Sequence, residues 1–192
     1  MTELNYELFA LRYATRHARR GDHFIGGDPH DGPMPMDYFV WAARGGGRTF
    51  VIDTGFNAEV SETRKRKFLR SPGEALATLG IDANAVEDVI LTHLHYDHVG
   101  NFDRFPKARF HLQERELVYA TGRTCVIIGE MLEGFDRLLA LAPDECHIVP
   151  GHDPLVMKLY LAPSPELEGI AVRLDVPPSS GAPNLADYSS HK

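Results

Sequence analysis

"THLHYDHVGN", residues 92–101, places three of the chain's ten histidines and an aspartate within six positions, and the segment before it is short and apolar. Residues 86–93, "VEDVILTH", predict a strand that runs directly into this cluster. Because side chains two positions apart on an extended chain point the same way, His93 and His95 present two imidazole rings to one point. The stretch therefore predicts a buried strand that ends in a polar site, which is typical of layered α/β proteins.

Two further side chains of the cluster are metal-ligand types. Asp97 continues the direction of the two histidines, and a turn at "HVGN" can bring His98 back toward them. Imidazole and carboxylate groups bind zinc, iron, cobalt or nickel. Four such groups exceed what one tetrahedral ion takes with a position left for water. The spacing thus indicates two adjacent ions, one on the first two histidines and one on Asp97 and His98. The alternative, a polar surface loop, is disfavoured by this tight HxHxDH spacing.

Composition sets outer limits on the class of protein. The chain has 192 residues, 43% hydrophobic, which suits one domain with a substantial core. A net charge of −7 gives no reason to expect nucleic acid or an anionic membrane as partner. Basic runs at residues 16–20 and 64–70 are interpreted as a solvated loop and a solvated helix face. Two cysteines without CxxC, no signal peptide and no membrane-span length predict a cytoplasmic setting.

Alternating strand and helix patterns predict an α/β layered domain over residues 1–176 and a flexible tail over 177–192. The clearest helix is "SPGEALATLG", where Ser71 caps, Pro72 starts, Glu74 completes a capping box and Gly80 ends it. Strands are predicted at 5–14, 36–44, 48–56, 86–93, 107–113, 146–153 and 168–176, and helices at 58–70, 71–80, 114–122 and 130–143.

These motifs carry a family resemblance. "THLHYDHVGN" is similar to the signature of the metallo-β-lactamase fold superfamily, and "FVIDTGF", residues 50–56, resembles its DTG-type strand end. "IVPGHD", residues 148–153, resembles the segment with the last histidine ligand, which maps to His152. "LVYATGR" and "EMLEGFDRL" look most like the N-acyl homoserine lactonase branch. The resemblance covers residues 36–175.

The resemblance implies an αββα sandwich, here with an incomplete second half, and a metal-dependent hydrolase. The implied metal ligands are His93, His95, Asp97, His98 and His152. Asp97 is the implied catalytic residue, able to pass a proton to the leaving group, and Asp53 orients a ligand histidine or simply shapes a strand-end turn. One or two zinc ions, or manganese, cobalt or iron, would hold a hydroxide that opens an ester ring such as an N-acyl homoserine lactone. The expected partners are a small-molecule substrate and, as a homodimer, a second copy.

One block of the family pattern is absent. Members place another histidine and a bridging aspartate before the last histidine, whereas neither residue type occurs between Arg123 and Glu130. His111, in mid-strand, is expected to pack or face solvent instead of substituting. A gap near residues 124–128 would uncover an apolar face of the sheet. One of three outcomes is then expected: the chain pairs with another copy, the fold is poorly stable, or the sequence omits residues that the natural protein has.

The gap keeps two alternatives open. The first is a weakly active or non-catalytic remnant that binds one metal or none. Of the five implied ligands, only His93 and His95 are left to bind the second ion. The second, phosphodiester hydrolysis, fits poorly with an acidic chain.

Overall fold

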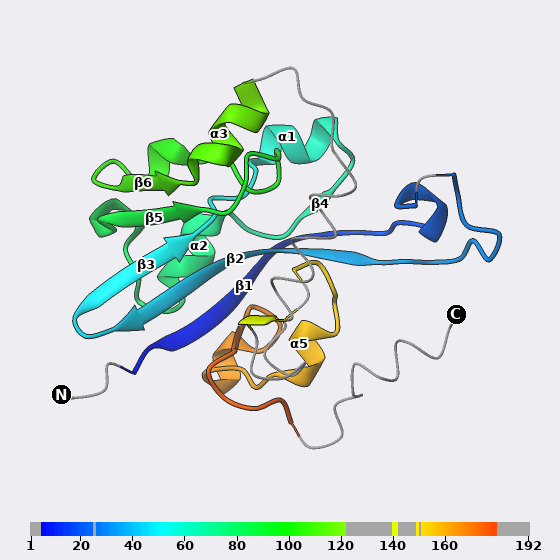
Figure 1. Ribbon diagram of the computed structural model, residues 1–192. Coiled ribbons are helices and arrows are strands. Elements are labelled where there is room, and N and C mark those ends of the chain that lie inside the picture. Colours follow the sequence, from blue (N-terminus) through cyan, green and yellow to red (C-terminus); the bar gives the residue numbers. More distant parts are fainter. Residues whose placement is uncertain (1–4, 25, 122–139, 142–148, 150, 180–192) are drawn as a thin grey trace.

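A mixed sheet of seven strands organises the protein (Figure 1). The computed structural model describes residues 5–24, 26–121, 140–141, 149 and 151–179. The strands are β1 Glu7–Arg16, β2 Met36–Gly45, β3 Arg48–Ile52, β4 Lys67–Phe68, β5 Asp88–Leu91, β6 Arg109–Leu112 and β7 Ala171–Arg173. Their order is β4-β1-β2-β3-β5-β6, with β7 also paired to β1. Neighbours β1, β2 and β3 are antiparallel, whereas β3, β5 and β6 are parallel.

The strands predicted at residues 36–44 and 48–56 form an antiparallel hairpin. Gly46 and Gly47 join β2 to β3, with φ angles of 57° and 74°. Two successive residues in the left-handed region give the tight turn that matches strand twist, and glycine adopts this conformation without a Cβ clash.

Helices are short and lie mainly between the strands. They are α1 Ala58–Thr63, α2 Pro72–Ala77, α3 Glu114–Thr121 and α5 Val156–Leu159, with 3-10 turns η1 Arg20–Asp22, η2 Ala83–Ala85, η3 Phe102–Arg104 and η5 Pro165–Leu167. The capping box of α2 forms as predicted: Glu74 N–H donates to Ser71 Oγ at 3.1 Å, and Ser71 N–H donates to the Glu74 carboxylate at 2.7 Å. No helix in the described ranges is long and apolar enough to cross a membrane.

The two faces of the sheet carry separate apolar clusters. Alternate residues of β1 and β2, such as Leu11 and Val40, join the main core with Leu76 of α2. The intervening residues Ala10 and Phe39 face the other way and pack against Val156 of α5 and Val172 of β7. Strand alternation accounts for this division, because successive side chains point to opposite faces. The C-terminal segment therefore reaches the sheet on the face opposite α2.

The predicted helix over residues 58–70 is wrong beyond Thr63. The chain turns at Lys65, whose φ is 54°, while Lys65 N–H bonds to Glu62 O and Arg66 N–H bonds to Ser61 O. This pair of bonds is a Schellman ending, in which the left-handed position is usually glycine. A lysine there gives no sequence signal for a helix end. Consequently the basic run after Arg64 forms a turn and β4, and its interpretation as a helix face is wrong.

Other predictions hold in part. A strand was predicted at 146–153, but its described residues, 149 and 151–153, belong to no strand. The strand predicted at 168–176 is shorter in the structure, where it forms β7. The α/β class is confirmed, and the sheet with its helices forms the first half of the expected sandwich. The gap near 124–128, most of the helix at 130–143 and the tail from 180 onward lie outside the described residues.

Candidate metal centre

The histidine motif follows the C-terminal end of β5 in a tight turn. His98 N–H donates to His95 O at 3.0 Å, so the turn that brings His98 back toward the other rings spans residues 95–98 and precedes the turn predicted at "HVGN". Gly100 lies against the segment after β3, where an added Cβ would be 2.8 Å from Gly55 O. The motif and the β3 end are thus packed backbone to backbone, and glycine is required at this close approach.

Asp53 fixes the ring of His98. This buried carboxylate lies 2.7 Å from His98 Nδ1 and also accepts hydrogen bonds from the N–H and Oγ1 of Thr92, both at 2.8 Å. An ionised carboxylate can only accept, so Nδ1 carries the ring proton and Nε2 keeps its lone pair. His98 is 7% exposed, with the Trp41 ring stacked at a centroid distance of 6.4 Å. Nε2 is therefore presented in a fixed direction.

His152 reaches the same place from the C-terminal segment. Its Nδ1 lies 3.0 Å from the backbone oxygen of Asp37 on β2, and its ring meets Tyr38 edge-on at 5.4 Å. A carbonyl oxygen also only accepts, so here too Nδ1 is protonated and Nε2 is free. The register of β2 places this carbonyl, since His152 O in turn accepts from Asp37 N–H at 3.1 Å.

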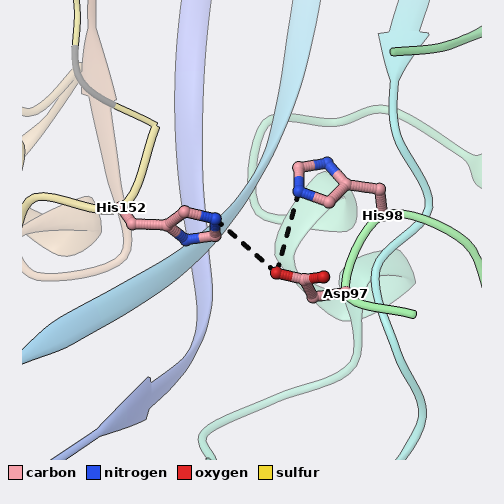
Figure 2. A group of neighbouring side chains, drawn as sticks. All are labelled: Asp97, His98 and His152. Carbon is pink, nitrogen blue, oxygen red and sulfur yellow. Dashed lines mark ion pairs between the residues drawn. The ribbon is translucent and has the colours of Figure 1, made fainter. Parts of the chain in front are cut away.

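The two free nitrogens face one carboxylate oxygen (Figure 2). Asp97 Oδ2 is 3.7 Å from His98 Nε2 and 3.6 Å from His152 Nε2, and the three ligand atoms all lie within 4.8 Å of one another. These separations are too long for hydrogen bonds. They approach the distance of about 3.4 Å between ligands on a tetrahedral ion with bonds of about 2.1 Å. Donor type, tautomer and spacing thus all fit a divalent metal ion.

His93 and His95 lie beside this group and outside it. The ring centroid of His93 is 3.8 Å from that of His98 and 4.7 Å from that of His95. Burial, followed by the neighbouring His98 and His95, lowers the pKa of His93 below its ordinary value. The neutral ring that results is the form that binds metals. The structure brings all five predicted ligand residues together, but groups only three of them around one point.

Several supporting contacts have no sequence signal. The hydroxyl of buried Tyr13 donates to the backbone oxygen of Asp97 at 2.8 Å, and burial raises the pKa of this phenol. Leu94 N–H donates to the carboxylate of Glu116 on α3 at 2.9 Å. Both hold the motif by its backbone. His111 is half exposed and lies 2.8 Å from Asp88, so it faces solvent and an ion-pair partner, as expected.

Part of this chain is similar in sequence to known proteins. Residues 34–121 match the family model of the metallo-beta-lactamase superfamily. Ribonuclease TTHA0252 of Thermus thermophilus is 36% identical over 110 residues, which is 56% of this chain and 22% of the relative. N-acyl homoserine lactonase AttM of Azorhizobium caulinodans is 50% identical over 42 residues, which is 22% of this chain and 16% of the relative.

A solved structure of a quorum-quenching N-acyl homoserine lactone lactonase has the same fold. Its TM-score is 0.50 at 15% sequence identity, over 63% of this chain and 51% of the lactonase. The aligned part therefore spans about half of that lactonase and about a fifth of the curated relatives. The predicted resemblance is confirmed. Residues 34–121 have the sequence pattern of metallo-β-lactamase proteins. The described part of the chain has their fold.

Proposed function

We propose that Asp97, His98 and His152 hold a divalent metal ion and that the protein is a metal-dependent hydrolase of the lactonase type. One observation carries this proposal: two histidines with fixed tautomers aim their free nitrogens at one oxygen of Asp97. The fold has no structural need for two unprotonated nitrogens, one on buried His98 and one on partly exposed His152, beside this carboxylate. Zinc suits the nitrogen and oxygen donors, with manganese, cobalt or iron as alternatives.

A metal ion held there would lower the pKa of a water molecule from its bulk value to near neutrality and so supply a nucleophile at neutral pH. Asp97 has a second carboxylate oxygen that can carry a proton to the departing alkoxide. Asp53 keeps the His98 ring in one orientation, and the Asp37 carbonyl does the same for His152. His93, whose pKa burial lowers, and His95 line the site and can hold a second, weaker ion.

Two relatives support candidate substrate classes. The match with the lactonase AttM is short but has high identity, which favours opening of an ester ring such as an N-acyl homoserine lactone. The longer match with a ribonuclease favours a second candidate, hydrolysis of a phosphodiester. The same residues would serve both reactions, because each needs an activated water molecule and a proton donor for a leaving oxygen.

A chelation experiment tests the proposed function. Opening of an acyl-lactone ring should stop on exhaustive chelation and return with zinc, manganese or cobalt, with a phosphodiester assayed in parallel. Asp97→Asn should abolish turnover, whereas Asp103→Asn, an exposed carboxylate with a 79% exposed side chain, should not. Turnover that survives chelation, or covalent labelling of a serine, would overturn the proposal. Absence of any turnover would favour the non-catalytic remnant.

A further inference from the structure

Four consecutive cations, Arg64–Lys65–Arg66–Lys67, follow α1 in a chain whose net charge is −7. Within the described ranges, none of the four forms an ion pair with a carboxylate, although most arginines elsewhere do. An uncompensated run of like charge costs stability through self-repulsion. The run therefore calls for an explanation beyond solvation.

The turn that carries these cations is firmly built. Lys65 holds a left-handed φ of 54°, Ser61 Oγ donates to Arg66 O at 2.8 Å, and Arg66 Nη1 donates to Arg64 O at 2.6 Å. Asp53, which orients His98, is the other described non-glycine residue with positive φ. Backbone strain of this kind gathers at functional sites. Both strained residues serve the same region, because the turn packs directly on the histidine motif.

Tyr96, between His95 and Asp97 in the chain, is the point of contact. The guanidinium carbon of Arg64 lies 3.7 Å from the Tyr96 ring centroid, and Arg66 Nε donates to the Tyr96 hydroxyl at 3.1 Å. The Tyr96 ring also stacks on buried Phe56, with 5.8 Å between the ring centroids. The Arg64 guanidinium thus lies over a ring that is itself packed against the core. None of its side-chain N–H groups bonds another residue in the described part of the chain, so its donors are free.

Arg66 is half-buried in the same cluster. Burial disfavours its charge, but the hydroxyls of Tyr96 and Tyr38 more than offset this, and the pKa of Arg66 lies above its ordinary value. Tyr38 in turn contacts the ring of His152. Arg66 is therefore one side chain removed from His152, through Tyr38, and Arg64 lies on Tyr96, the residue between His95 and Asp97 in the chain.

We propose that Arg64 and Arg66 form a subsite for an anionic group, a carboxylate or a phosphate, on the substrate hydrolysed beside Asp97, His98 and His152. This inference rests on the proposed function and narrows it to anionic esters. A planar guanidinium offers paired N–H donors that match two oxygens of such a group. The aromatic stack fixes Arg64 in advance, so little side-chain entropy is lost on binding.

A matched substrate pair tests the subsite. One lactone carries a free carboxylate or phosphate on its side chain, and the other carries the neutral methyl ester of that group. Hydrolysis should favour the anionic lactone. Arg64→Gln and Arg66→Gln should each lower kcat/KM for the anionic lactone by roughly tenfold to a hundredfold, as loss of a charged hydrogen bond does, and leave the neutral one unchanged.

Lys107→Gln is the control, because this exposed lysine precedes the N-terminal end of β6, whereas the motif follows the C-terminal end of the parallel strand β5. It should change neither rate. Equal losses on both lactones would overturn the subsite and leave the hydrolase standing.

A binding measurement separates the two proposals. Inorganic phosphate is titrated into the protein while the arginine side-chain N–H resonances are followed by NMR, with sodium chloride at matched ionic strength as reference. Saturable shifts of the Arg64 and Arg66 signals support the subsite even when no lactone is hydrolysed. Identical responses to phosphate and chloride would overturn it, whatever the activity.

Discussion

A single carboxylate, Asp53, decides which nitrogen of His98 faces the metal site. Asparagine at this position keeps the size of the side chain but replaces one acceptor oxygen with a donor amide. Asp53→Asn should therefore weaken metal binding by roughly tenfold to a hundredfold, the usual effect of losing such a partner. Cobalt titration can be followed through quenching of Trp41, which is the chain's one tryptophan and stacks on His98.

Asp103→Asn supplies the matched control for this titration, because Asp103 is exposed and pairs only with its neighbour Arg104 among the described residues. Equal cobalt affinity in Asp53→Asn and the unmodified chain would mean that His98 needs no orienting partner.

At the scale of residues, the sequence predicted those parts of the site that depend on the type of side chain. The spacing of His93, His95, Asp97 and His98 was sufficient to place them at a strand end, and His152 came from resemblance alone. The carbonyl of Asp37 that orients His152 could not be predicted, because every residue has a carbonyl and only the fold selects this one. Tyr13 is likewise 84 positions from its acceptor on Asp97.

The helix α2 shows an element whose signals are entirely local. Ser71 accepts from Glu74 N–H, one of the first N–H groups that have no partner inside the helix. Ser71→Ala should lower the free energy of unfolding by about 1 kcal/mol, measured by urea denaturation. Ser164→Ala is the control, since Ser164 precedes η5 without a side-chain cap hydrogen bond. Equal losses in both variants would contradict the capping role.

Elements without local signals were predicted less well. The two residues of β4 pair with Ala14 and Thr15 of β1, more than fifty positions away, so no periodicity reveals this strand. The end of α1 depends on a lysine in a position that favours glycine. By contrast, β2, β3 and β5 combine apolar runs with nearby turn residues and were predicted at the right places. The ends of β2 were predicted closely, whereas β3 and β5 are each shorter than predicted. Local chemistry thus predicts the elements, and distant pairing adjusts their lengths.

On the scale of the whole sheet, Asp88 joins three strands. Its carboxylate meets His111 Nε2 at 2.8 Å, Arg109 Nη2 at 3.0 Å and Arg48 Nη2 at 3.3 Å. The hydrogen bond from His111 is the main cause that lowers the pKa of Asp88, followed, after an opposing effect of burial, by that of Arg48. The ionised form is thus favoured by folding.

The stabilising effect of Asp88 should be complete above the unfolded carboxyl pKa of about 3.9 and lost as pH falls through the lower folded value. Urea midpoints measured from neutral pH down to acid should therefore differ between the unmodified chain and Asp88→Asn at neutral pH, and should converge below about pH 4. Parallel curves would show that the three contacts do not favour the ionised form.

The metal content of the whole molecule distinguishes a complete two-metal hydrolase from a single-metal protein. Asp97, His98 and His152 surround one point, whereas no carboxylate in the described ranges joins His93 and His95 in a second group. One equivalent of zinc per chain should therefore survive gel filtration into metal-free buffer, and any second should be lost. His152→Ala should lose the retained ion, and His93→Ala should keep it. Zinc at a hundred times its dissociation constant should also stabilise the fold by about 2.7 kcal/mol, visible as a raised Tm. Two retained equivalents, or full retention in His152→Ala, would mean that the ion is held by a different set of ligands from the three that the geometry selects.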